Sequence, residues 1–212
     1  MGTQTLVLLG DSILDNAPYT DPEPDTTDHL RRLLAPEWSI RRLAQDGARM
    51  ADVQSQLRAL DERPAVTVLS IGGNDALEHI GILEKRVSTA AAVLADLLTI
   101  AEQFANEYEA VVRAVAERSE RVLLCTIYEV QLAPAPLARL AKVPLAVLND
   151  RIVRTAARLG LDVLELRAVC TEPGDFVQQI EPSPQGAAKI AHAIAGTVRG
   201  RKAASVSRVF AA

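Results

Sequence analysis

The sequence predicts an α/β fold in which one parallel sheet is covered by helices on both faces. Short runs rich in leucine and β-branched residues show little alternation of apolar and polar positions, as strands buried on both faces do. Segments with apolar residues at helical spacing separate these runs, so that strands and helices alternate along the chain. The predicted strands are Thr5–Leu9, Ser39–Leu43, Ala65–Ile71, Arg121–Ile127 and Leu161–Leu166.

The predicted helices lie between and after these strands. Asp28 is expected to cap the first helix, which ends near Leu34 because Pro36 stops it. Apolar residues recur at helical spacing through Arg86–Arg118, which is expected to form one bent helix or two. Three further helices are predicted at Ala48–Leu60, Leu145–Leu159 and Pro184–Val198.

Length and composition limit the classes of protein to consider. The 212 residues are expected to form a single domain, 1–212, with residues 200–212 as a loose tail. A net charge of −4 argues against nucleic acid as a partner, and the short basic stretch Arg199–Arg208 is expected to be solvated. Cys125 and Cys170 belong to no metal-binding pattern and are expected to be buried free thiols.

The sequence contains no recognisable membrane, export or cofactor signal. Its apolar runs are shorter than the roughly 18 residues that a membrane span needs. No signal peptide is recognised before the first strand, so the cytoplasm is the expected location. The glycine patterns of dinucleotide and nucleoside triphosphate sites are missing, and neither a cofactor nor a metal is expected.

Three motif-like segments follow the first three predicted strands. They are Gly10-Asp11-Ser12, Asp46-Gly47-Ala48-Arg49 and Gly72-Gly73-Asn74-Asp75. Functional sites of parallel sheets lie at the carboxyl ends of the strands, so these segments are expected to converge. Ser12 is either a reactive hydroxyl at the mouth of such a site or the N-cap of a helix.

The residue types in these segments suit the stabilisation of a developing oxyanion. Asn74 has a side-chain amide with two N–H donors, and Gly47 can expose its backbone N–H because it carries no side chain. Together with the backbone N–H of Ser12, they would form three donors around a negatively charged oxygen. An ordinary tight turn is the alternative interpretation of Gly72–Asp75.

These segments resemble the SGNH (GDSL-type) hydrolases, a superfamily of esterases, lipases, thioesterases and carbohydrate deacetylases. The match is carried by Gly10–Ile13 (GDSI), Gly47, Gly72–Asp75 (GGND) and a closing block at Glu181–Ile194. The resemblance implies a flavodoxin-like three-layer α/β/α sandwich with a five-stranded parallel sheet. It also implies that Ser12 is the nucleophile and that the three donors named above form the oxyanion hole.

The closing block departs from the pattern of the family. The family places an aspartate three residues before a histidine that serves as general base, whereas this chain has Gln178 and Glu181 at these positions. Glu181 is therefore the candidate base, although a carboxylate needs burial to raise its pKa toward neutrality. His79 and His29 are alternative bases. Arg49 is a candidate for binding an anionic substrate.

Other acidic residues lie close to the motifs. Asp11 is expected to fix the turn that contains Ser12, and Asp75 to cap the segment that follows it. Asp175 belongs to the final loop, from which it can approach the site. A magnesium-type site formed by Asp11, Asp75 and Glu181 is a further alternative, which requires the three carboxylates to converge.

The sequence as a whole predicts a serine hydrolase that cleaves a small-molecule ester or acyl group through an acyl-serine intermediate on Ser12. A weak or inactive protein that binds an acyl or carbohydrate ligand is the alternative, because the usual histidine is missing. Asp15–Asp28 and Tyr128–Lys142 are expected to shape the pocket, and their mixed composition matches neither a lipid tunnel nor a sugar platform. The oligomeric state is not predicted.

Overall fold

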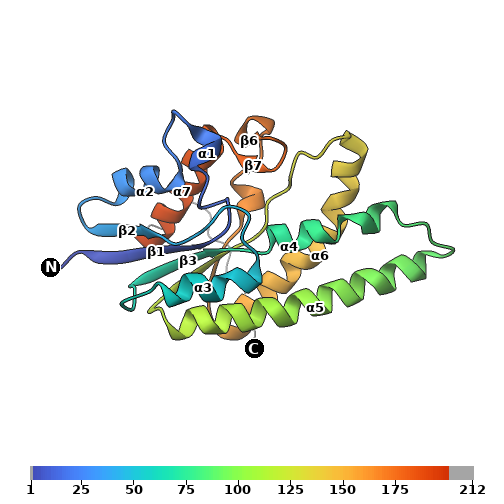
Figure 1. The fold of residues 1–212 in the computed structure, drawn as a ribbon, viewed down its shortest axis with the longest axis horizontal. Coiled ribbons are helices and arrows are strands. Elements are labelled where there is room, and N and C mark those ends of the chain that lie inside the picture. The colour runs from blue at the N-terminus through green and yellow to red at the C-terminus, as the bar shows by residue number, and fades with distance from the viewer. Residues whose placement is uncertain (1, 201–212) are drawn as a thin grey trace.

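The computed structural model describes residues 2–200, and a five-stranded parallel sheet lies at its centre (Figure 1). The strands are β1 (Gln4–Gly10), β2 (Trp38–Arg42), β3 (Val66–Ser70), β4 (Val122–Cys125) and β5 (Asp162–Leu164). Their order in the sheet is β2–β1–β3–β4–β5, and all neighbours are parallel. The predicted strands are confirmed, with ends that differ by a few residues.

Helices cover both faces of this sheet, which confirms the three-layer α/β/α sandwich (Figure 1). The α-helices are α1 (Ala17–Thr20), α2 (Thr26–Leu34), α3 (Val53–Arg58), α4 (Gly73–Glu78), α5 (Ala90–Glu117), α6 (Ala135–Leu159) and α7 (Pro184–Val198). Short 3₁₀ helices are η1 (Met50–Asp52), η2 (Ile80–Glu84), η3 (Leu166–Ala168) and η4 (Pro173–Asp175). α2 and α7 pack against one face of the sheet, and α3, α5 and α6 against the other.

The side chains of β1 alternate between two hydrophobic cores. Leu6 and Leu8 pack toward α2 and α7, while Val7 and Leu9 pack toward α3, α5 and α6. All four residues are at most 1% exposed. Because both faces of the strand are covered, every position needs an apolar residue, which explains the unbroken apolar run in the sequence.

Several predicted helix boundaries are wrong. Asp25, and not Asp28, caps α2, because the Asp25 carboxylate accepts a hydrogen bond from the Asp28 N–H at 2.7 Å. Arg86–Arg118 contains one helix, α5, which begins after Thr89 and is not interrupted. The predicted helix at Ala48–Leu60 is divided into η1 and α3.

Two elements near the site are not predicted by the sequence. α6 begins at Ala135, ten residues before the predicted start, and continues through Pro144. A two-stranded antiparallel hairpin, β6 (Phe176–Val177) and β7 (Glu181–Pro182), precedes α7. A proline inside a helix and strands of two residues both lack the periodicity on which sequence-based prediction rests.

Other expectations concern the cysteines and the ends of the chain. Cys125 and Cys170 are buried and unpaired, as predicted. Within residues 2–200 no helix combines the length and the apolar character needed to cross a bilayer. The loose tail and most of Arg199–Arg208 lie outside the described residues, and the single-domain boundary stays a prediction.

Candidate active site

Ser12 lies in a tight turn at the carboxyl end of β1. The Asp11 carbonyl closes this turn by accepting hydrogen bonds from the N–H groups of Leu14 and Asp15, both at 3.1 Å. Ser12 is 9% exposed and lines a pocket between α4, α5 and α6. The next helix, α1, has Asn16 as its N-cap, so the interpretation of Ser12 as a helix cap is wrong.

A side chain from α3 holds the backbone just before this turn. The Gln56 side chain accepts a hydrogen bond from the Gly10 N–H and donates one to the Gly10 carbonyl, each at 2.8 Å. The Asp11 N–H donates to the Ser70 carbonyl at the end of β3, at 3.1 Å. These bonds satisfy backbone groups where the strand ladder ends. The sequence does not single out Gln56, because it belongs to no motif.

Glu181 lies on β7 and lines the same pocket as Ser12. It is 7% exposed, and burial raises the pKa of its carboxyl above the usual value. The nearby Ser12 hydroxyl opposes this shift, and the negative charge of Asp46 adds to it. Glu181 Oε2 is buried and has no hydrogen-bond partner in the described part of the chain. The structure thus brings Ser12 and Glu181 together, with no cation among the groups that shift the pKa of Glu181.

The β6–β7 hairpin sets the position of Glu181. Its turn contains Gln178 and Gln179 in the left-handed region, with φ of 48° and 72°, which residues other than glycine rarely adopt. The Tyr128 hydroxyl donates a hydrogen bond to the Ile180 carbonyl at 2.5 Å and so holds the turn against the segment after β4. Backbone strain of this kind persists only where the surrounding structure enforces it.

Asn74 and Gly47 come to the site from different loops. Asn74 lines the pocket, and its side chain donates one hydrogen bond to the Ala48 carbonyl at 2.9 Å, which leaves its second N–H available. Within residues 2–200, the backbone N–H groups of Ser12 and Gly47 donate to no protein acceptor. Gly47 does not line the pocket, so its part in an oxyanion hole stays a prediction.

Asp11 is a second buried acid next to Ser12. It is 3% exposed, and its Oδ1 accepts a hydrogen bond from the Ile13 N–H at 3.2 Å, as expected for a residue that fixes the turn. Burial raises the pKa of Asp11 to about 8, an effect that the Ile13 N–H opposes and the charges of Glu181 and Asp75 increase. At neutral pH Asp11 is therefore mainly protonated, and Glu181 faces a neutral neighbour.

The raised pKa of Asp11 predicts a dependence of stability on pH. Between the unfolded pKa of about 4 and the folded pKa of about 8, the native state keeps a proton that the unfolded state has released. The free energy of unfolding therefore decreases as pH rises through this window and levels off above it. Asp11→Asn has the shape of the protonated acid but does not titrate. Its free energy of unfolding relative to that of the wild type is therefore expected to increase by a few kcal/mol between about pH 5 and pH 8, since one pKa unit is about 1.4 kcal/mol. Urea unfolding at the two pH values measures the free energy of unfolding of both proteins. The same change with pH in both proteins would contradict the raised pKa of Asp11.

Arg49 and Asp75 are not placed as predicted. Arg49 is exposed, forms an ion pair with Glu78 and does not line the pocket. Asp75 lies within the first turn of α4, whose N-cap is Gly72, and so cannot cap that helix. Both carboxylate oxygens of Asp75 instead accept a hydrogen bond from the Met50 N–H at 3.3 Å, at the start of η1. Asp75 thus joins two of the loops around the site.

The two alternative bases differ in position. His79 follows α4, is exposed and lines the same pocket. His29 belongs to α2 and lines no part of the pocket, which makes it the wrong candidate. Burial lowers the pKa of His29, and the nearby charges of Arg32 and His192 lower it further.

Asp175 does not reach the site either. Its buried carboxylate pairs with Lys189 at 2.7 Å and accepts a hydrogen bond from Gln185 at 2.9 Å, so it joins η4 to α7. The described residues include no group of three or more His, Cys, Asp or Glu side chains able to hold a metal ion. The carboxylates of Asp11, Asp75 and Glu181 therefore do not converge as the magnesium-type alternative requires.

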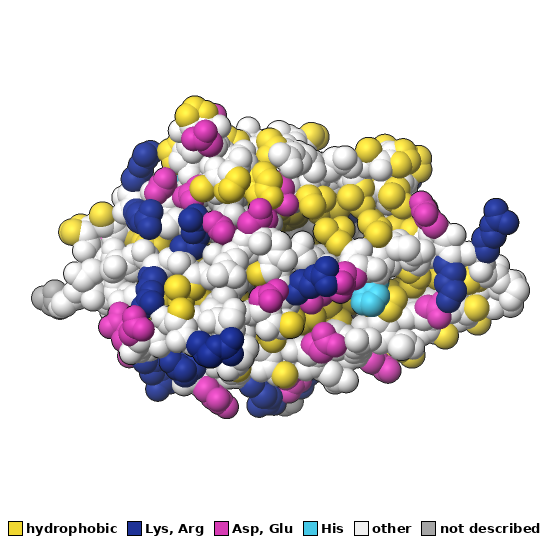
Figure 2. Space-filling model, in the orientation of Figure 1, with side chains coloured by type: hydrophobic (Ala, Val, Ile, Leu, Met, Phe, Trp, Pro, Cys, Tyr) yellow, Lys and Arg dark blue, Asp and Glu magenta, His cyan; other side chains and the backbone are white. Residues whose placement is uncertain are grey.

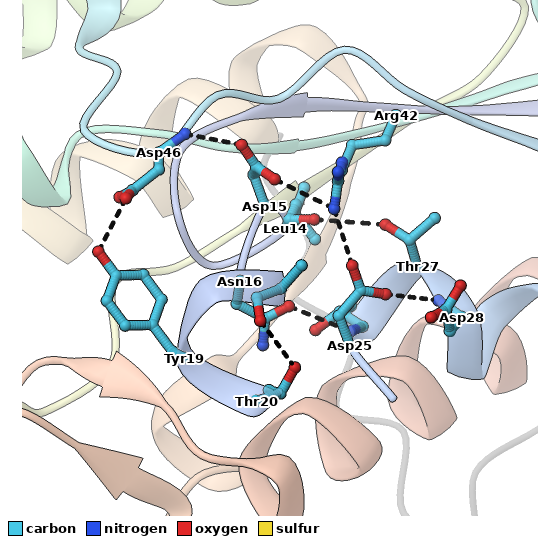
Figure 3. A network of polar contacts seen from close by, with 12 residues as sticks. Leu14, Asp15, Asn16, Tyr19, Thr20, Asp25, Thr27, Asp28, Arg42 and Asp46 are labelled. Carbon is cyan, nitrogen blue, oxygen red and sulfur yellow. Dashed lines mark hydrogen bonds and ion pairs between the residues drawn. The ribbon is translucent and has the colours of Figure 1, made fainter. Parts of the chain in front are cut away.

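A polar network joins the loop after β1 to the loop after β2 (Figure 3). Arg42 forms an ion pair with Asp15 at 3.0 Å, and Asp15 also accepts a hydrogen bond from the Asp46 N–H at 3.0 Å. The Asp46 carboxylate accepts a hydrogen bond from the Tyr19 hydroxyl at 2.8 Å. The network fixes Asp46 in the position from which its charge raises the pKa of Glu181.

The pocket beside Ser12 is mainly apolar and measures about 890 Å³, with open solvent at its mouth included. Hydrophobic side chains surround a hollow on this side of the molecule (Figure 2). The expected contribution of Asp15–Asp28 is wrong, since none of its residues lines the pocket, whereas Tyr128–Lys142 supplies part of one wall. Most apolar lining residues come from η2, α5 and α6, and they include Ile80, Ile82, Leu83, Leu97, Ile100, Pro144, Leu145 and Leu148.

The sheet order and the place of Ser12 define the class of protein. It is a parallel α/β protein of three layers, and Ser12, at the carboxyl end of the first strand, lies where such sheets form their ligand sites. The particular family follows from the sequence: the chain belongs to the GDSL-like lipase/acylhydrolase family, whose profile matches residues 8–189. Among curated proteins, none matches the chain.

Solved structures similar to this chain are hydrolases of the same fold. A lipase/acylhydrolase from Enterococcus faecalis has 22% sequence identity and a TM-score of 0.69, covering 97% of this chain and 100% of its own. A phospholipase A1 from Streptomyces albidoflavus has 16% identity and a TM-score of 0.68, with coverage of 93% and 99%. An acetylxylan esterase from Geobacillus stearothermophilus, in the form of a catalytic mutant, has 17% identity and a TM-score of 0.63, with coverage of 92% and 94%. At these identities the similarity establishes the fold, and the substrates of these proteins differ.

Proposed function

We propose that the protein is a serine hydrolase that cleaves esters of apolar acyl groups through an acyl-serine intermediate on Ser12, with Glu181 as general base. One observation carries this proposal: Ser12 and Glu181, both nearly buried, line the same apolar pocket. The pocket suits an acyl chain, because apolar walls favour binding of apolar chains and a few polar groups orient the ligand. An anionic headgroup recognised by Arg49 is not part of the proposal.

The proposed reaction follows from the polar groups in and beside the pocket. Ser12 Oγ attacks the ester carbonyl carbon, and its proton passes to the Glu181 carboxylate. The carbonyl oxygen becomes an oxyanion that accepts hydrogen bonds from the N–H groups of Ser12 and Gly47 and from the Asn74 side chain. As the tetrahedral intermediate breaks down, the proton on Glu181 moves to the leaving alkoxide, which departs as an alcohol.

Deacylation repeats these steps with water as the nucleophile. Glu181 takes a proton from the water that attacks the acyl-serine, and the same donors hold the second oxyanion. The proton then returns to Ser12 Oγ as the acid is released. Burial favours this use of a carboxylate, because a raised pKa makes Glu181 a stronger base than an exposed glutamate.

Covalent labelling tests the proposed nucleophile directly. The wild-type protein is expected to react with a fluorophosphonate probe at about pH 7–9, because the ionised fraction of Glu181, whose pKa is raised by burial, increases with pH. Ser12→Ala is expected to abolish the labelling while the circular dichroism spectrum stays unchanged. Mass spectrometry of the labelled peptide identifies the modified residue. A wild-type protein that remains unlabelled across this range would reject the hydrolase proposal.

Such a result would favour a binding protein without turnover. One observation supports this second candidate: Glu181 Oε2 has no partner within residues 2–200 that orients it, unlike the imidazole of a complete catalytic triad. An unlabelled protein that still binds a fluorescent fatty acid in this pocket would establish it. Binding that is lost on substitution of pocket residues would place the ligand there.

The dimensions of the pocket predict a dependence on acyl chain length. Leu97 lines the pocket, so Leu97→Trp is expected to reduce kcat/KM for p-nitrophenyl decanoate about tenfold through overpacking, with little change for the acetate ester. Thr99→Trp is a matched control, because Thr99 is exposed on the same helix and does not line this pocket. Equal losses for the short and the long ester would argue that the chain binds elsewhere.

A further inference from the structure

The exposed hydrophobic residues of the protein are concentrated at one place. Large hydrophobic side chains with an exposed fraction of 38–62% occur only at Val87, Leu94, Leu98, Leu140 and Val143 within residues 2–200. They lie before and along the first turns of α5 and on the first turns of α6. Single exposed hydrophobic residues are normal on a protein surface, but their concentration on two neighbouring helices indicates an interaction site. We call these five residues the apolar patch.

The apolar patch is continuous with the wall of the pocket. On α5, Leu97 faces the pocket, while Leu94 and Leu98 on either side of it are exposed. On α6, Pro144 lines the pocket next to the exposed Val143. Figure 2 shows hydrophobic side chains around the hollow and on the surface beside it. An acyl chain that leaves the pocket would therefore pass directly onto the patch.

The charges around the apolar patch have one prevailing sign. Asp96 is the only charged residue from position 87 to position 101, and it pairs with Lys85. On α6, Lys142 pairs with Glu129. Arg86 and Arg139 are exposed next to the patch and take part in no ion pair within residues 2–200. Glu84, two residues before Arg86, is also exposed and in no ion pair within residues 2–200. The unpaired charges beside the patch are thus two positive and one negative, although the chain as a whole has a net charge of −4.

We propose that the apolar patch docks on an anionic lipid surface, with Arg86 and Arg139 at the level of the headgroup phosphates. Apolar side chains bordered by arginines are the pattern by which amphipathic surfaces enter the boundary between headgroups and acyl chains. Anionic lipid attracts juxtaposed cations and adds to the burial of the apolar side chains. In this orientation the pocket opens onto the lipid layer. Binding requires no turnover, so it is independent of the proposed hydrolase activity.

Vesicle sedimentation tests this proposal with the whole chain. One set of vesicles is phosphatidylcholine alone, and the other is phosphatidylcholine and phosphatidylglycerol at about 7 to 3, so that only the second is anionic. The wild-type protein is expected to bind the anionic vesicles at least about fivefold more strongly than the neutral ones. Leu94→Glu with Leu140→Glu is expected to reduce this binding about tenfold or more. Arg86→Gln with Arg139→Gln is expected to reduce only the preference for anionic lipid.

The control variant carries the same added charge elsewhere. Ala51→Glu with Ala110→Glu changes two exposed positions outside the patch and is expected to bind like the wild type. The Leu94→Glu, Leu140→Glu variant keeps the pocket lining, so hydrolysis of a soluble ester is expected to be unchanged if the hydrolase proposal holds.

Three results would overturn the docking proposal. The first is a wild-type protein that stays in the supernatant with both kinds of vesicle. The second is a Leu94→Glu, Leu140→Glu variant that sediments as well as the wild type. The third is a wild-type dimer in analytical ultracentrifugation that this variant dissociates, because the apolar patch would then be covered by a second copy. Absence of fluorophosphonate labelling affects none of these measurements and bears only on the proposed function.

Discussion

Glu181→Gln is expected to lower kcat for a soluble ester by about 10²–10⁴, the usual contribution of a general base. Glutamine has nearly the same shape as glutamate but cannot accept the Ser12 proton. KM is expected to change little, because the apolar lining that holds the acyl chain is untouched. Initial rates with p-nitrophenyl butyrate measure both parameters. A residual rate is expected to remain, since oxyanion donors and binding accelerate a reaction even without the base.

His79 provides the comparison for this experiment. It is the remaining histidine candidate, exposed on the rim of the same pocket, and His79→Gln is expected to keep the wild-type rate. Loss of activity in His79→Gln together with full activity in Glu181→Gln would transfer the role of base to the histidine. The pH profile adds a second readout: with Glu181 as base, activity rises with pH through the raised pKa of this carboxyl. That rising limb is expected to disappear from the residual rate of Glu181→Gln.

The convergence of Ser12 and Asn74 can be predicted from the sequence, because the rule behind it is topological. Parallel strands have their carboxyl ends at one edge of the sheet, so residues that follow β1 and β3 must lie close together. The structure confirms that both residues line one pocket. The same argument places Gly47 at this edge but does not determine whether its N–H points toward Ser12.

The surroundings of Glu181 cannot be predicted in this way, because they depend on contacts between segments that are distant in the sequence. The Tyr128 hydroxyl holds the hairpin that carries Glu181, and the network around Asp46 supplies a nearby negative charge. Neither Tyr128 nor Asp46 belongs to a periodic pattern. The apolar character of the pocket depends likewise on the packing of η2 and α5 against an α6 that extends through Pro144.

Gly10→Ala is expected to destabilise the protein by at least about 3 kcal/mol, or to prevent its folding. A methyl group at position 10 would lie 1.7 Å from the Ser70 carbonyl oxygen, and this neighbour is backbone of β3 that cannot rotate away. The φ of +127° at Gly10 is in addition a conformation that residues with a side chain rarely adopt. Relief of the clash would require β1 and β3 to separate and would disturb the hydrogen bonds between Gly10 and Gln56. Urea unfolding at neutral pH measures the loss.

Gly47→Ala separates the effect of the clash from that of the backbone conformation. Gly47 also has a positive φ, +75°, but no atom lies within 4 Å of the position where its methyl group would be. This variant is expected to lose only about 1 kcal/mol, the cost of a left-handed conformation for alanine. If Gly10→Ala and Gly47→Ala reduced the free energy of unfolding by the same small amount, the close approach of β1 to β3 at Gly10 would be contradicted. A large loss of stability in Gly10→Ala alone would establish that this contact holds the strand end from which Asp11 and Ser12 extend. Any folded Gly10→Ala protein is then expected to label poorly with the fluorophosphonate probe.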